Sequence, residues 1–159
     1  MNHTFEKFFR YIIGGNQIIG GLIGLFFASN IDFNQFLSHF FLYLIIIGLF
    51  VFSIYCGLYL LINKTNGYKL TLINQYPQLA KIILLGYGYE YYTGLIFFVG
   101  FTDTPKFNLF AQIEAAFRSQ AYLFMNSKSD EISIMVNIIP IIIVAIIFRL
   151  EKKEIIKIK

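Results

Sequence analysis

Three long stretches of this 159-residue sequence contain no Asp, Glu, Lys or Arg: residues 11–31, 33–63 and 132–148. A helix that crosses a bilayer needs about 20 predominantly apolar residues, within a range of about 17–25. Only 14% of the residues are charged, whereas soluble domains carry roughly 25%. The first stretch exceeds the roughly 7–15 apolar residues of a signal-peptide core, which favours an uncleaved span. The stretches predict a helical membrane protein.

Basic residues at the ends of these stretches predict the orientation of the chain. Lys7 and Arg10 precede the first stretch, and Lys64 and Lys69 follow the second. Five further Lys and Arg residues follow the last stretch, whereas the loop between the first two has none. Cytoplasmic loops of membrane proteins carry an excess of Lys and Arg. Both termini are therefore predicted to be cytoplasmic, which requires an even number of crossings and a further one before Lys128.

Two interpretations of the missing crossing remain open. In the first, residues 82–101 form the crossing helix and place Glu90 inside the membrane, at about 2.5–3.5 kcal/mol on insertion scales. In the second, residues 68–86 cross the membrane and residues 86–101 are extended outside it. Four glycines, many aromatic residues and a period of two in the latter segment favour the second interpretation.

The favoured fold class is a mainly α, helical integral membrane protein with four transmembrane spans. A small, partly β extracytoplasmic segment lies between spans three and four, and the whole chain forms a single membrane domain. The spans are expected at about 11–30, 38–62, 68–86 and 132–149, the extracytoplasmic segment at about 87–130 and a cytoplasmic tail at 150–159.

Polar residues within the expected spans form a candidate intramembrane face. Asn74, Gln78 and Lys81 share one side of a helix, with Lys81 extending toward the outer headgroups. The full candidate set is Asn16, Gln17, Asn74, Gln78, Lys81 and Asn137. Such amides either hydrogen-bond between helices or line a polar path or a lipid-headgroup pocket. In one continuous helix, Lys81 and Glu90 would lie about 13 Å apart on opposite faces and could not pair.

Two further groups are candidates for contacts. Gly20 and Gly24 have the small-residue spacing that lets helices approach closely, either within the chain or in a homodimer. The aromatic segment after residue 86 supplies a candidate outer contact surface, which comprises Tyr87, Tyr89, Tyr91, Tyr92 and Glu90.

The segments "CGLYLLINKTNGYKLTLINQYPQL", "GYGYEYYTGL" and "ISIMVNIIPIII" resemble a group of uncharacterised small multi-pass membrane proteins from Bacteroidota. The resemblance covers about residues 56–148. Its matching positions are Gly57, Gly67, Leu70, Asn74, Gln75, Gln78, Tyr91, Gly94, Leu95, Ile134 and Asn137. The resemblance implies an extended segment at 86–101 and a location in the bacterial inner membrane, and it implies no catalytic residue.

Motifs typical of catalysis are absent from the sequence. It has no HExxH, GxSxG or P-loop pattern, and its single cysteine and two histidines do not have metal-ligand spacing. We therefore expect no metal and no cofactor. The leading hypothesis is a non-catalytic accessory, assembly or interaction protein of the inner membrane. The alternative is a small transporter, channel or lipid-binding protein. The expected partners are membrane lipid and either another protein or a second copy, and no nucleic acid.

Overall fold

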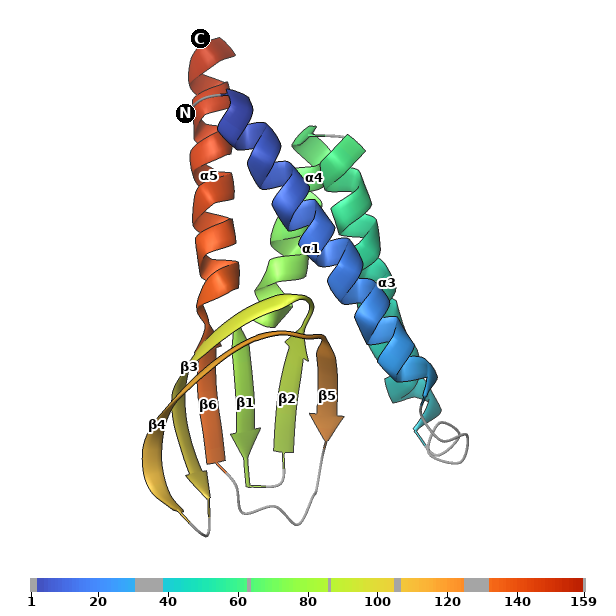
Figure 1. The fold of residues 1–159 in the computed structure, drawn as a ribbon, viewed down its shortest axis with the longest axis vertical. Coiled ribbons are helices and arrows are strands. Elements are labelled where there is room, and N and C mark those ends of the chain that lie inside the picture. The colour runs from blue at the N-terminus through green and yellow to red at the C-terminus, as the bar shows by residue number, and fades with distance from the viewer. Residues whose placement is uncertain are drawn as a thin grey trace.

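The computed structural model describes residues 3–30, 39–62, 64–85, 87–104, 107–124 and 132–158. The helices are α1 (His3–Ser29), α3 (Phe40–Ile62), α4 (Lys64–Gln75) and α5 (Ile138–Ile158), and a 3₁₀ turn, η1 (Tyr76–Gln78), follows α4. The strands are β1 (Ala80–Leu84), β2 (Tyr87–Tyr92), β3 (Leu95–Thr104), β4 (Phe107–Phe117), β5 (Gln120–Phe124) and β6 (Ile132–Asn137). The helices form one end of the molecule, where both termini lie, and the sheet forms the other end (Figure 1).

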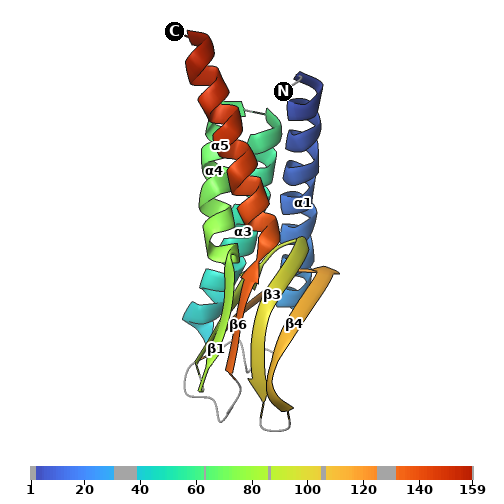
Figure 2. The same cartoon turned by 90° about the vertical axis from the view of Figure 1, so that its left-hand side faces the viewer.

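The six strands form one sheet in the order β4-β3-β6-β1-β2-β5, and every neighbouring pair is antiparallel. The links from β2 to β3 and from β4 to β5 are two residues each, and the curved strands β3 and β4 themselves arch across the central strands at the helix end of the sheet (Figure 1). The far ends of α1 and α3 lie beside the sheet rather than above it (Figures 1 and 2). The two halves of the fold therefore overlap along the long axis.

The fold is not the mainly helical four-span bundle that the sequence predicts. Among the described residues, two helices are long and apolar enough to cross a membrane, namely Thr4–Ser29 and Phe40–Ile62. The helices expected at 11–30 and 38–62 are confirmed as α1 and α3, although position 38 lies outside the described residues. The third and fourth expected spans are each divided between a helix and a strand. The apolar residues of these spans that are not helical lie in the sheet.

The predicted helix at 68–86 is wrong because the chain changes from helix to strand within it. α4 ends at Gln75, and Pro77 occupies the 3₁₀ turn that follows. Proline has no backbone N–H to donate to the preceding turn, so an α-helix is not favoured through Pro77. Ile82 and Ile83 then lie in β1, where β-branched side chains pack well against neighbouring strands.

The fourth predicted span, 132–149, is a strand for its first six residues and a helix from Ile138. Burial alternates along β6, so that Ser133, Met135 and Asn137 are buried and the residues between them are not. At the junction, Asn137 Oδ1 accepts the backbone N–H of Ile139 at 3.3 Å. The side chain thus caps the helix N-terminus, which ends the strand and begins α5.

The interpretation that makes residues 82–101 a helix is also wrong, because β2 and β3 occupy that segment. The β structure expected at about 87–130 is confirmed for the described residues of β2 to β5, whereas 105–106 and 125–131 lie outside them. The sheet is larger than expected because β1 and β6 extend it through two predicted spans. Residues 150–158 of the expected tail continue α5.

Candidate functional site

A cluster of buried polar side chains joins the helices to the sheet, and we call it the helix–sheet junction. Its members are Gln17 on α1, Ser53 on α3, Thr71 and Asn74 on α4, Gln78 in η1, and Tyr91 and Thr93 at the end of β2. Each is at most 2% exposed. Because buried polar groups need partners, the junction is expected to be internally hydrogen-bonded.

The hydrogen bonds of the junction run across all these elements. Asn74 Nδ2 donates to Ser53 Oγ at 3.2 Å, and Tyr91 donates its hydroxyl to Asn74 Oδ1 at 3.3 Å. Ser53 Oγ lies 3.0 Å from Thr93 Oγ1. The backbone N–H of Thr93 donates to Gln78 Oε1 at 2.9 Å. The amides predicted at positions 17, 74 and 78 are therefore brought together, and they hold the sheet against the helices.

Close backbone contact completes this attachment. Gly94 has φ +82°, a conformation that favours glycine, and it forms the turn between β2 and β3. A side chain on Gly20 would collide with the backbone of this turn, and one on Gly24 would collide with the ring of Phe50 on α3. Gly20 and Gly24 therefore both make close contacts within the chain, Gly20 with a turn of the sheet and Gly24 with α3.

The remaining predicted amides also support the strands. Asn16 Oδ1 accepts the N–H of Leu95 at 2.8 Å, and Asn137 Oδ1 accepts the N–H of Phe97 at 3.1 Å. Among the described residues, Gln17 Nε2 and Asn137 Nδ2 are buried without a hydrogen-bond partner. These contacts correct the predicted single intramembrane face, because they attach strands to helices rather than line a path.

Lys81 lies apart from the junction, on the buried inner face of the sheet. Its Nζ is 3.5 Å from Glu90 Oε1, and the two side chains are 16% and 6% exposed. The prediction that Lys81 and Glu90 lie on opposite faces of one helix is wrong. The two residues belong to the adjacent antiparallel strands β1 and β2, in which Ile82 pairs with Tyr89. That register places Lys81 and Glu90 opposite each other, on one face. Glu90 is therefore a buried, paired carboxylate.

The tyrosines predicted as an outer contact surface are mostly internal. Tyr91 and Tyr92 are 1% and 0% exposed, Tyr89 is half-buried and Tyr87 is 60% exposed. Tyr92 donates its hydroxyl to Gln120 Oε1 at 2.8 Å.

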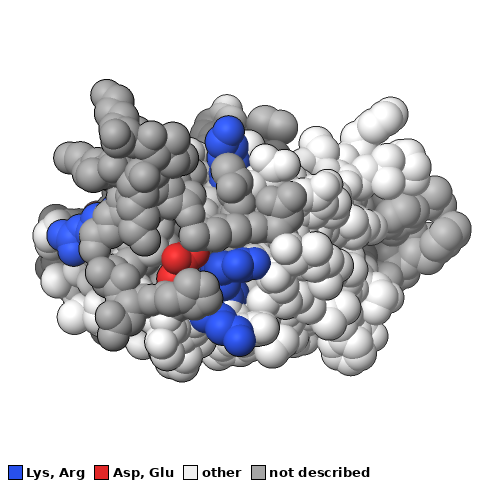
Figure 3. Space-filling model, turned by 90° about the horizontal axis from the view of Figure 1, so that it is seen from above, with Lys and Arg blue, Asp and Glu red and all other residues white. Residues whose placement is uncertain are grey.

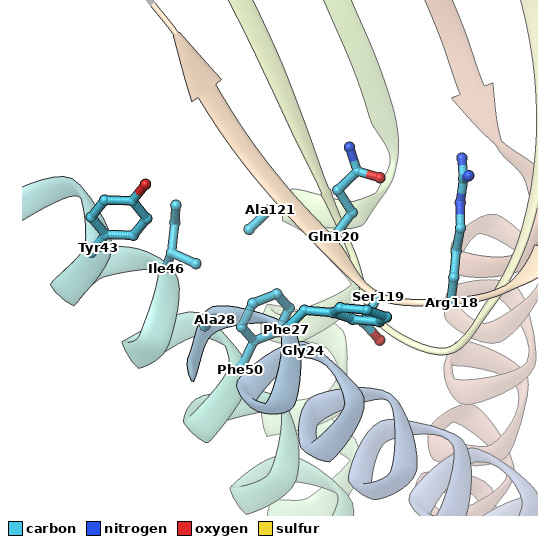
Figure 4. A pocket seen from close by; sticks show the side chains of 10 residues that line it. All are labelled: Gly24, Phe27, Ala28, Tyr43, Ile46, Phe50, Arg118, Ser119, Gln120 and Ala121. Carbon is cyan, nitrogen blue, oxygen red and sulfur yellow. The ribbon is translucent and has the colours of Figure 1, made fainter. Parts of the chain in front are cut away.

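A pocket lies between the α1–α3 pair and the link from β4 to β5, and we call it the hairpin pocket. Its volume is about 360 Å³. The helices contribute a mostly apolar wall and the link a mostly polar one (Figure 4). The lining residues are Gly24, Phe27, Ala28, Tyr43, Ile46, Phe50, Arg118, Ser119, Gln120 and Ala121.

Contacts outside the pocket fix the position of its polar wall. The Arg118 guanidinium pairs with Glu114 and lies 5.5 Å from the centre of the Tyr92 ring. Ser119 Oγ donates to the carbonyl of Gly20 at 2.6 Å. Arg118 and Gln120 therefore line one side of the apolar space, with the guanidinium paired to Glu114 and the Gln120 oxygen accepting the Tyr92 hydroxyl.

Sequence reasoning missed the hairpin pocket because its walls come from segments nearly 100 positions apart. The signal that points to it is the polar run Arg118-Ser119-Gln120, which interrupts an otherwise largely apolar, alternating segment. Within the described part of the chain, no three His, Cys, Asp or Glu side chains lie close enough to hold a metal ion. Cys56 is buried and its thiol lies 3.4 Å from the carbonyl of Leu70.

No protein-family model, no curated protein and no solved structure matches this chain. What the site can do therefore follows from its own geometry, which combines an apolar pocket that has a polar wall with buried polar groups at the helix–sheet junction and on the inner face of the sheet.

Proposed function

We propose that this chain is a non-catalytic protein of the bacterial inner membrane that holds one amphipathic lipid molecule in the hairpin pocket. The acyl chain would lie among Phe27, Ile46 and Phe50, and Arg118 and Gln120 belong to the polar wall of the same pocket. The observation that carries this proposal is the division of the pocket into an apolar helix wall and a polar strand wall. A volume of about 360 Å³ lies within the range of small-molecule sites.

The distribution of charge supports the membrane placement. Lys and Arg side chains gather at the end of the molecule that carries both termini (Figure 3). Arg10 donates from Nε and Nη2 to the carbonyls of Leu60 and Leu61, at the last turn of α3, at 2.8 Å each. An excess of basic residues marks the cytoplasmic side of membrane proteins, so this end is assigned to the cytoplasm.

The other interpretations have less support. The interaction hypothesis relied on an exposed aromatic surface, but Tyr91, Tyr92 and Glu90 are buried. A polar transport path relied on a shared face of Asn74, Gln78 and Lys81. Two of these close a hydrogen-bonded junction and the third pairs with Glu90.

The test is crosslinking with a photoactivatable fatty-acyl phospholipid in the purified, detergent-solubilised protein. We expect labelled peptides from the ends of α1 and α3 that line the pocket and from β5. Ala121→Phe fills the pocket, and we expect it to lower labelling about tenfold, since overlap of this kind costs about 1–3 kcal/mol. The matched control is Ala115→Phe, on an exposed position of β4 outside the pocket. Equal labelling of wild type and Ala121→Phe would reject the proposal.

A further inference from the structure

The face of the sheet that points away from its core is apolar and exposed. Exposed fractions range from 37% at Phe97 to 69% at Ile113, and the side chains come from four adjacent strands. The strand register places them on one face, which we call the outer face: Ile82, Leu84, Phe97, Val99, Phe101, Ile113, Ile134 and Val136. Contiguous apolar patches of this kind are rare on soluble monomers and indicate an interaction site.

The opposite, inner face carries the polar groups of the sheet. The Lys81–Glu90 pair lies there, and Thr102 Oγ1 is 3.0 Å from Ser133 Oγ and donates to Gln112 Oε1 at 2.8 Å. The same inner face also holds an apolar cluster of Tyr92, Ile96, Phe98 and Met135. Antiparallel sheets in water usually place polar side chains outward. The outer face of this sheet is apolar instead, which is typical of strands whose outer side faces lipid.

The attachment of the sheet fixes its depth relative to α1 and α3. Asn16, whose side chain holds the N–H of Leu95, lies near the middle of α1. On α3, Tyr91 donates to the carbonyl of Leu49 at 3.0 Å and Thr93 contacts Ser53, and both partners lie near the middle of that helix. If α1 and α3 cross the bilayer, the helix end of the sheet lies near its centre.

The strands then run from that level through one leaflet. β6 rises about 20 Å over six residues at about 3.3 Å each, and Ile138–Phe148 of α5 adds about 16 Å at 1.5 Å per residue. Their sum is sufficient for a hydrocarbon core of about 30 Å. Along the outer face of β3, the first charged side chain is Asp103, near the end of the strand farthest from the helices.

We propose that the outer face of the sheet is embedded in the bilayer and contacts the acyl chains of the non-cytoplasmic leaflet. Helices then face lipid in the cytoplasmic leaflet, while the sheet and the ends of α1 and α3 do so in the other leaflet. Of the four strands of the outer face, β3, β6 and β1 have a hydrogen-bonded strand on each side, whereas β4 lies at the edge of the sheet and has one. The three inner strands present side chains rather than unpaired backbone groups, as hydrocarbon requires. This inference rests on the membrane placement of the proposed function but not on a ligand in the hairpin pocket.

The sequence contains no Trp, so single-Trp variants give an unambiguous fluorescence signal. Phe97→Trp and Phe101→Trp probe the outer face at two depths, and Leu44→Trp provides a reference on the exposed surface of α3. Gln112→Trp probes the inner face. Each variant is reconstituted into phosphatidylcholine vesicles whose acyl chains carry bromine either near the headgroup or near the chain end. Emission is compared with that in unbrominated vesicles and with iodide in the aqueous phase.

We expect Phe97→Trp to lose about half of its emission in brominated vesicles, as Leu44→Trp does, because both side chains lie within the hydrocarbon core. Chain-end bromine should quench Phe97→Trp more strongly, and headgroup-proximal bromine should quench Phe101→Trp more strongly. Gln112→Trp should be quenched least by bromine. This depth order supports lipid as the occupant of the face.

Other outcomes separate the possible failures. Quenching of both outer-face variants by iodide but not by bromine, with Leu44→Trp quenched by bromine, would overturn the embedded sheet and leave the membrane placement standing. If neither quencher reaches the outer face, and if dilution of the protein with lipid restores quenching, the face is covered by a second copy of the chain. That result would also overturn the proposal. Absence of bromine quenching in Leu44→Trp would reject the membrane placement itself.

Discussion

Two buried polar regions of the described chain differ in charge. The helix–sheet junction is built from neutral amides and hydroxyls whose partners lie on several elements. The inner face of the sheet holds an ion pair, Lys81 and Glu90, whose partners lie on neighbouring strands. Neutral groups in a closed network are satisfied by hydrogen bonds, whereas a buried charge depends on one oppositely charged partner. The two regions should therefore respond differently when one residue is removed.

The largest effect is expected from Lys81→Met, which leaves the Glu90 carboxylate buried without its cation. Among the described residues, Glu90 Oε1 has no hydrogen bond, so Lys81 Nζ at 3.5 Å is its nearest compensation. Breaking a buried pair in this way lowers the free energy of unfolding by about 3–5 kcal/mol. Thermal unfolding in detergent, followed by circular dichroism, measures the change.

Two variants serve as controls for this experiment. Lys69→Met removes an exposed lysine from α4 and should change stability by no more than about 0.5 kcal/mol. The double variant Lys81→Met with Glu90→Leu removes both charges and should return to within about 1 kcal/mol of wild type. If the double variant is as unstable as Lys81→Met, the ion pair is not the source of the loss.

The same two regions show which parts of the structure could be predicted from the sequence. The apolar parts of α1 and α3 follow from uncharged stretches of adequate length, although α1 begins earlier, at His3. The period of two indicated the extended segment that contains Glu90. β1 is only five residues long, and periodicity cannot distinguish a strand of that length from a turn or two of helix. Pro77 lies within the predicted helix at 68–86, but it occupies the turn where α4 has already ended.

The candidate site was harder to predict than the fold, because its residues are brought together by tertiary structure. Lys81 was grouped with Asn74 and Gln78 by helical spacing, but the strand after Pro77 rotates it onto another face. Its pairing with Glu90 follows from the register between β1 and β2, which depends on the whole sheet. The hairpin pocket likewise requires the tertiary approach of α1 and α3 to the β4–β5 link.

An intermediate effect is expected at the junction from Asn74→Leu. The change removes the donor to Ser53 Oγ and the acceptor for the Tyr91 hydroxyl, and both groups are buried. We expect a loss of about 2–3 kcal/mol, since unsatisfied buried polar groups cost about 1–3 kcal/mol each and Tyr91 keeps its bond to the Leu49 carbonyl.

The control for the junction is Asn30→Leu just after the end of α1, where the exposed amide donates to the Phe26 carbonyl. Unlike the ion pair, the neutral junction should not tolerate a charge, so Asn74→Asp should be at least as damaging as Asn74→Leu. An Asn74→Asp variant with wild-type unfolding would show that water reaches the junction and would remove the distinction between the two regions.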